Sequence, residues 1–426
     1  MSSRLDLPWQ RAAAAAAAIS VAATFLVGSY EFVRSVSTSL FISAYGAKSL
    51  PYAMTAVPFA MAAMVYGYGW LLSRLGAMRT LVLSSLGSAL VFILCYGALK
   101  QDWPLAAAFL YVFRQVYIVL IVEQYWSLIN SFLKPEQARL YNGPIIGGAS
   151  IGPVLAGWLI HRKAVAMGSE QIILLAVAAL LPATLLAYLA YRISGEPTPA
   201  PDEEGGRQGH LHLSLLGQNP RLALLAGIVC LAQVVSTATD LRFSALLEAT
   251  IPLKDERTAF LGGFWSTTNL ASSGLQFVVT PLLLSILPQR WIFLGIPMIH
   301  IAAASFLLAS PSLHSAALSL LLFKSFDYSL FRATKELIYI PLSFDSRYRA
   351  KQVIDTFTYR ASMGLTSAVL SAATMVAGAL PGGFYPMAAM GAAAAWAGLT
   401  LPLTAPGPQA GSSRPTEESR PDPRRT

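Results

Sequence analysis

The sequence predicts an all-α membrane protein of about twelve transmembrane helices. Of its 426 residues, 55% are hydrophobic and only 12% are charged, whereas roughly a quarter of the residues of a soluble domain are charged. The mean hydropathy is +0.55, and apolar runs of the ~20 residues that span a bilayer recur along the whole chain. Because so few charged residues cannot form a water-exposed surface, we expect lipid to surround this protein.

The apolar runs predict six helices in each half of the chain. We expect them at 12–40, 51–72, 78–98, 103–132, 138–160 and 170–193, and then at 221–247, 258–286, 290–309, 311–340, 349–378 and 382–404. Several runs contain Gly or Pro, which membrane helices tolerate because neighbouring helices satisfy the freed backbone groups. The alternating pattern of a membrane β-barrel does not occur.

The segment between the two sets of helices predicts a domain boundary. Residues 194–220 are rich in Pro, Gly and charge, which is typical of a flexible cytoplasmic linker. Residues 405–426 have a similar composition and predict a disordered cytoplasmic tail. The sequence therefore predicts an N-terminal half at 1–193, a linker at 194–220, a C-terminal half at 221–404 and a tail at 405–426.

The basic residues predict the orientation in the membrane. With the N-terminus in the cytoplasm, seventeen Lys and Arg residues fall on the cytoplasmic side and six on the other side. Short cytoplasmic loops carry such an excess of Lys and Arg, so we expect both termini in the cytoplasm and a multi-pass protein of the cell inner membrane. The net charge of +9 is then a consequence of topology and does not indicate a nucleic-acid partner.

The two halves repeat each other at an offset of 212 residues. This offset relates 69–79, after the second expected helix, to 281–290, after the eighth, and it also relates Ala138-Arg139 to Ala350-Lys351. Halves of equal orientation are related by an axis along the membrane normal. The 69–79 segment resembles the G-x-L-x-D-R-x-G-R-R signature of the major facilitator superfamily, with Ser73 in place of Asp. This resemblance implies a major-facilitator-type 6+6 bundle.

Charged residues inside the expected helices predict a polar path through the bundle. A charge at a helix centre costs roughly 2.5–3.5 kcal/mol, so these residues should face one another or a wet cavity. The cations are Arg34, Arg114, Arg242, Lys324, Arg332, Lys335 and Arg360, and the anions are Glu31, Glu123, Asp240, Asp327, Glu336 and Asp355.

Polar side chains at helical spacing indicate the same path. The stripes are Gln233, Ser236, Thr237, Asp240 and Ser244 on the seventh helix; Trp265, Thr268, Asn269, Ser272 and Gln276 on the eighth; Lys324, Asp327, Tyr328, Phe331, Lys335 and Tyr339 on the tenth; and Asp355, Thr358, Tyr359 and Ser362 on the eleventh. Interhelical hydrogen bonding is the alternative explanation for any single Ser or Thr. Lys324 and Asp327, three residues apart, are expected to neutralise each other.

The tenth helix and its exit carry two distinctive segments, since residues 332–342 are RATKELIYIPL and 349–355 are RAKQVID. They closely resemble K-E-M-A-Y-I-P-L and K-G-K-A-A-I-D in the ATP:ADP antiporters of plastids and intracellular bacteria, a distant branch of the same superfamily. The resemblance implies that Lys335 and Asp240 contact substrate, since they match the lysine of helix ten and the glutamate of helix seven. The family's first-helix lysine falls on Ser37, and its helix-four glutamate falls near Arg114 or Gln115.

We therefore predict a secondary active transporter, not an enzyme, that moves a nucleotide or related anionic metabolite by alternating access. Lys335, Arg114 and Arg34 would attract phosphate or carboxylate, Asp240 and Asp355 would balance charge or carry a proton, and Trp265, Tyr328 or Tyr359 would stack on a base. No Walker-type loop occurs, and Cys95 and Cys230 offer neither a disulfide framework nor metal-ligand spacing. We expect no cofactor or metal, a lipid bilayer as partner and a functional monomer.

Two other functions fit the same sequence. A proton-coupled exporter of drugs or metabolites needs a buried acid such as Asp240. A non-transporting membrane sensor or assembly subunit on the same scaffold is compatible with the altered charges at Ser37 and Arg114. An enzyme is disfavoured because the sequence contains no evident nucleophile–base pair or metal cluster.

Overall fold

The computed structural model describes residues 8–133, 135–195, 217, 219–339, 352–378 and 380–405. Within these ranges the regular elements are all helices. The first group is α1 (Trp9–Tyr45), α2 (Leu50–Leu99), α3 (Pro104–Phe132), α4 (Pro135–Met167) and α5 (Ser169–Ser194). The second group is α7 (Pro220–Thr250), α8 (Lys254–Gly274), α9 (Thr280–Ile286), α10 (Gln289–Ala309), α11 (Leu313–Phe326), α12 (Arg332–Tyr339), α14 (Tyr359–Ala377) and α15 (Phe384–Leu403).

Three short π-helices interrupt the second group. They are η3 (Leu275–Val279) between α8 and α9, η4 (Asp327–Phe331) between α11 and α12, and η5 (Gln352–Thr358) before α14. A π-helix bonds residue i to residue i+5 and is found mostly as a single turn within an α-helix, frequently at a functional site. Each of the three therefore continues a longer helix while changing the direction in which its side chains point.

The described helices confirm the predicted membrane class and are consistent with about twelve spans. Nine segments of the described chain are long and apolar enough to cross a membrane. One of them, Ala47–Leu99, is broken at Gly76, whose φ of 77° lies in the left-handed region that favours glycine. It therefore contains both spans expected at 51–72 and 78–98. The tenth expected span is formed by α11, η4 and α12, and the described part of the eleventh by η5 and α14.

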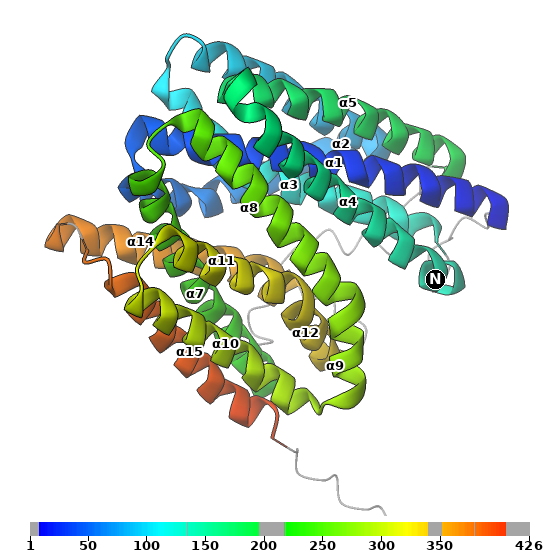
Figure 1. Cartoon of the computed structure of the whole chain (residues 1–426). Coiled ribbons are helices and arrows are strands. Elements are labelled where there is room, and N and C mark those ends of the chain that lie inside the picture. The colour runs from blue at the N-terminus through cyan, green and yellow to red at the C-terminus, as the bar shows by residue number, and fades with distance from the viewer. Residues whose placement is uncertain are drawn as a thin grey trace, which may run out of the picture.

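The two groups of helices lie on opposite sides of the molecule, with α8 running between them (Figure 1). One apolar cluster joins α1 to α5 through residues such as Ile19, Leu128 and Ile173. Another joins α7, α10 and α15 through residues such as Val229 and Phe293. Most of the linker expected at 194–220 and of the tail expected at 405–426 lies outside the described residues. The division at these boundaries stays a prediction.

Close backbone contact joins the two groups where α4 crosses α8. A Cβ atom at Gly157 would lie 2.6 Å from the carbonyl oxygen of Gly262, and one at Gly262 would lie 2.6 Å from Ile160. These distances are too short for a side chain at either position. The two glycines therefore let α4 and α8 approach, as small residues commonly do between membrane helices.

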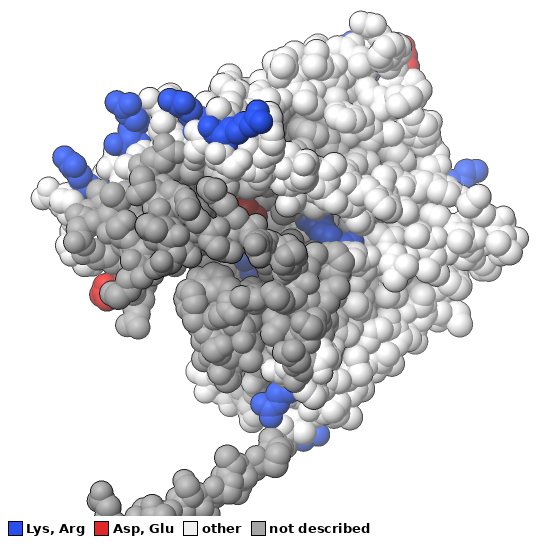
Figure 2. Space-filling model, turned by 180° about the vertical axis from the view of Figure 1, so that it is seen from behind, with Lys and Arg blue, Asp and Glu red and all other residues white. Residues whose placement is uncertain are grey.

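Polar contacts between the groups gather toward one end of the bundle, formed by Ala47–Ser49, the α4–α5 turn and the start of α8. We call it the contact end. Here Lys254 forms an ion pair with Glu170, and the backbone N–H of Ala47 donates to Glu248 Oε2 at 2.8 Å. Away from this end, on the face opposite that of Figure 1, a hollow exposes Lys or Arg and Asp or Glu atoms (Figure 2).

Candidate functional site

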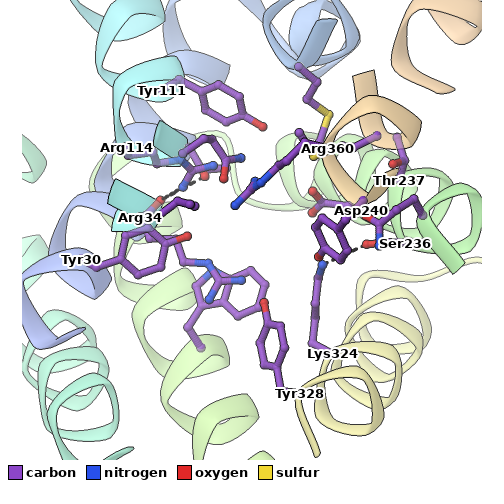
Figure 3. Close-up of a pocket in the computed structure, with 18 of the residues that line it drawn as sticks. Tyr30, Arg34, Tyr111, Arg114, Ser236, Thr237, Asp240, Lys324, Tyr328 and Arg360 are labelled. Atoms are coloured by element: carbon purple, nitrogen blue, oxygen red, sulfur yellow. Dashed lines mark hydrogen bonds between the residues drawn. The ribbon is translucent and has the colours of Figure 1, made fainter. Parts of the chain in front are cut away.

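A cavity of about 340 Å³ lies between the two groups of helices, within the size range of small-molecule sites. Its walls come from α1, α2 and α3 on one side and from α7, α8, α11, η4, η5 and α14 on the other. Seven charged side chains line it, namely Arg34, Arg114, Lys324, Arg360, Glu123, Asp240 and Asp355. Figure 3 shows Arg34 and Arg114 on one side of the cavity and Asp240, Lys324 and Arg360 on the other. We call it the central cavity.

Arg34 is held against an aromatic ring of the opposite group. Its guanidinium carbon lies 3.2 Å from the centroid of the Trp265 ring, and its NH1 atom lies 3.8 Å from Glu31 Oε2 on the same helix. Trp265 is 5% exposed. Arginine stacks well on indole because its guanidinium is planar and weakly hydrated. One face of Trp265 is therefore covered by Arg34, so the ring positions this cation at the cavity wall.

Arg114 is fixed beside Arg34 from the neighbouring helix α3. Its NH1 group donates to the backbone carbonyl oxygen of Arg34, and its guanidinium carbon lies 4.4 Å from the Tyr111 ring centroid. The residue is 6% exposed, and its Nε atom has no hydrogen-bond partner among the described residues. Arg114 therefore presents a buried donor that a ligand could satisfy.

Lys324 belongs to the cavity wall and makes no direct ion pair with Asp327. Its ammonium donates to Ser236 Oγ on α7 at 2.9 Å. Lys324 and Asp327 are both described, and no ion pair joins them, although the two charges attract each other at longer range. The direct contact is missing because η4 begins at Asp327, where the α-helical spacing of the two residues ends.

Arg360 is a cavity residue that the stripe on the eleventh helix does not include. It projects into the central cavity near Asp240 (Figure 3), and it forms no ion pair with any described residue. In an α-helix, five residues turn Arg360 well away from Asp355. A π-helical turn brings residues five apart toward the same side, and η5 contains Asp355. Its charge within a membrane helix was the one sequence feature that marked Arg360 as a cavity residue. The change of helical period that turns it toward the cavity is not visible in the sequence.

Lys335 lies outside the lining of the central cavity. Its Nζ atom is 2.7 Å from Asp355 Oδ1, with 11% of the lysine side chain and 30% of the aspartate side chain exposed. Tyr339 Oη also donates to Asp355 Oδ1 at 3.4 Å. The lysine that the sequence favours as a direct anion contact is therefore bound to a carboxylate. Its partner lies twenty residues away on another helix, so local spacing did not reveal it.

The remaining predicted residues line the central cavity. Asp240 comes from α7, Tyr328 from η4 and Tyr359 from the start of α14. Glu123 on α3 also lines it, although it was not among the predicted contacts. Nine residues, or two and a half turns, separate it from Arg114, so an ideal α-helix would put the two on opposite faces. Both nevertheless line the cavity. Seven of the eight predicted contacts thus line one cavity. The eighth, Lys335, forms an ion pair with Asp355, which is one of the seven.

The arrangement of charges suits an anionic ligand. Four cations and three anions line the cavity, and one of the anions, Asp355, is engaged by Lys335. Arg114, Lys324 and Arg360 make no ion pair within the described chain. Cations held in a site of low dielectric attract an anion far more strongly than they do in water. A phosphate or carboxylate between them would also supply hydrogen-bond acceptors.

The comparisons in sequence find nucleotide carriers. The chain is similar to the chloroplastic ADP,ATP carrier protein 1 of Arabidopsis thaliana, with 24% identity over 280 residues, covering 56% of this chain and 43% of the carrier. It is also similar to ADP,ATP carrier protein 1 of Chlamydia muridarum, with 22% identity over 304 residues, covering 62% and 57%. The chain thus spans about half the length of these relatives. The predicted resemblance to ATP:ADP antiporters is confirmed as a sequence similarity. No family model matches the chain.

The comparisons in structure find transporters of several kinds. A crystal structure of a mutant of the nucleoside transporter NupG matches 92% of this chain and 98% of its own, with 12% identity and a TM-score of 0.62. An auto-inhibited POT family peptide transporter matches 91% and 96%, with 14% identity and a TM-score of 0.63. At such identities the likeness concerns the fold alone, and it confirms the predicted major-facilitator-type bundle.

Proposed function

We propose that this multi-pass membrane protein is a secondary active transporter, and not an enzyme, that moves a nucleotide or a related anionic metabolite by alternating access. The observation that carries the proposal is the central cavity, where Arg114, Lys324 and Arg360 meet without forming ion pairs among the described residues. The similarity to two ADP,ATP carrier proteins supports a nucleotide over other anions. We further propose that it works as a monomer.

The placement of the cations supports exchange of one anion for another. Arg34 and Arg114 belong to the first group of helices, whereas Lys324 and Arg360 belong to the second. Closing an empty cavity brings like charges together at low dielectric, which is unfavourable. An anion between them removes that repulsion and lets the two groups rock around the occupied site. The loaded carrier then changes conformation more readily than the empty one, so transport in one direction depends on a return substrate.

We propose the cell inner membrane as the location, with both termini in the cytoplasm, because basic residues crowd that side of the sequence. In this orientation the contact end faces outward, and the hollow of Figure 2 belongs to an inward-facing conformation. Fusions of a reporter that is active only in the cytoplasm are expected to be active at either terminus. A silent fusion that is present in the membrane at normal amounts would refute this orientation.

Ligand binding tests the proposed substrate class before transport does. We expect ADP and ATP to raise the melting temperature of the purified protein, because a ligand that binds the folded state stabilises it. Adenosine, which has the base and sugar but no phosphate, should stabilise it much less. Raising the salt concentration should weaken the nucleotide effect by screening the charges that face solvent. Stabilisation by adenosine equal to that by ADP would contradict an anion site.

A further inference from the structure

A second cavity of about 460 Å³ adjoins the central cavity. Tyr328 lines both of them. On α3, Val122 lines the second cavity and its neighbour Glu123 lines the central one. The two cavities therefore lie next to each other along α3 and η4. We call the second one the apolar cavity.

The apolar cavity has one apolar wall and one polar wall. Helices α1, α3 and α4 contribute side chains such as Leu26, Trp126 and Ile145, whereas α8 and η3 contribute Asn269, Ser272, Ser273 and Gln276. Among the described residues that line it, Arg332 is the one basic residue and none is acidic. A mostly apolar pocket with a few polar groups that can orient a ligand is typical of a small-molecule site.

The polar wall holds one amide that is available to a ligand. Ser272 and Ser273 donate to carbonyl oxygens of their own helix, each at 2.8 Å. The side-chain amide of Asn269 donates to Glu31 at 3.3 Å. Gln276 is half-buried, and its side chain forms no hydrogen bond with any described residue. Its carboxamide can both donate and accept, which suits the hydrogen-bonding edge of a heterocycle.

Both π-helices at this place present a cavity residue. Gln276 lies in η3 and Tyr328 lies in η4, and the two segments contact each other. A π-helical turn has poorer packing than an α-helical one and is found frequently at functional sites. Here one turn places Gln276 in the lining of the apolar cavity, and the other places Tyr328 in the lining of both cavities.

We propose that the apolar cavity binds the heterocyclic base of a nucleotide whose phosphates lie in the central cavity. Trp126 provides an aromatic surface for the ring, and Gln276 hydrogen-bonds to its edge. This inference rests on the proposed function and specifies it further. It assigns the substrate class as an anion joined to a planar heteroaromatic ring, and it sets inorganic phosphates and small dicarboxylates aside as poor ligands.

Two probes of the same charge type separate the two cavities. ADP carries a diphosphate and a base, whereas pyrophosphate carries only the diphosphate. We expect the purified full-length protein to bind ADP more tightly than pyrophosphate. Trp126→Ala should weaken ADP binding about tenfold, the effect of removing one stacking side chain, and should leave pyrophosphate binding within about twofold. Gln276→Leu, which keeps a side chain of similar size, should also weaken ADP binding more than pyrophosphate binding. It provides the test if the Trp126→Ala protein does not fold.

Trp158→Ala is the matched control, because Trp158 is 53% exposed on α4 and lines neither cavity. It should leave the dissociation constants of both probes unchanged. Equal affinity of the wild-type protein for ADP and pyrophosphate would overturn the base site and leave the anion site standing. So would equal weakening of both probes by Trp126→Ala and Gln276→Leu. If neither probe binds the wild-type protein, the proposed function fails, and this inference fails with it.

Discussion

Replacing Arg360 by Gln is expected to weaken ADP binding about ten- to a hundredfold and to abolish transport. The guanidinium projects into the central cavity (Figure 3) and makes no ion pair within the described chain. Its attraction is therefore available to the substrate. A hydrogen bond to a charged group contributes about 1.5–3 kcal/mol, and every 1.4 kcal/mol is tenfold in affinity. The measurement is the dissociation constant of ADP for the purified variant.

The stability of the same variant separates binding from folding. Removing a cation that has no local partner should leave the melting temperature of the ligand-free protein unchanged or raise it, because repulsion within the cavity falls. Arg162→Gln is the matched control, since Arg162 is exposed on α4, away from both cavities. An Arg360→Gln protein that melts normally and still binds ADP with wild-type affinity would remove Arg360 from the site.

Replacing Lys335 by Gln is expected to lower the free energy of unfolding by about 3 kcal/mol, because it leaves the largely buried Asp355 carboxylate without its cation. The Lys335 ammonium lies 2.7 Å from Asp355, and both side chains are largely buried. Removing both charges leaves no stranded group. The double variant, Lys335→Gln with Asp355→Asn, should therefore recover most of the loss. Unfolding of the wild type, both single variants and the double variant measures the coupling between the two residues.

The alternative is that Lys335 contacts the substrate directly. In that case Lys335→Gln would lose ADP affinity while keeping its stability, and Asp355→Asn would not rescue it. Asp240→Asn is a useful comparison, because Asp240 lines the central cavity but is not bonded to Lys335. It should fail to restore the stability of the Lys335→Gln protein. Rescue by Asp240→Asn and not by Asp355→Asn would contradict the pairing described here.

Several elements of the fold could be predicted from the sequence because they depend on local composition. The apolar runs predicted α5 and α7 within a few residues of their observed ends. The charged residues within the expected membrane helices predicted a polar cavity between them. Arg34, Arg114 and Asp240 do lie on one cavity. The reason is energetic, because a charged side chain in a membrane helix is costly in lipid and therefore faces another polar group or a water-filled cavity. The existence of the cavity therefore follows from sequence, although its detailed geometry does not.

The partners of the site residues depend on tertiary contacts that spacing within one helix does not contain. Trp265 stacks on Arg34 from a different group of helices. Lys335 bonds Asp355 across a long separation. Arg360 joins the cavity wall where π-helical geometry shifts the helical period. A helical stripe gives the direction of a side chain and not the group that it contacts, so the partners of Trp265 and Lys335 are visible only in the structure.

Counter-transport in proteoliposomes tests the central claim most directly, namely that an anion crosses through the central cavity by exchange. Purified protein is reconstituted with ADP inside the vesicles, and the uptake of labelled ATP is measured against vesicles without internal nucleotide. We predict saturable uptake that requires the internal ADP, is unaffected by external adenosine and disappears in the Arg360→Gln protein. Uptake of labelled adenosine with none of ATP or ADP, or equal uptake by wild-type and Arg360→Gln protein, would contradict the account.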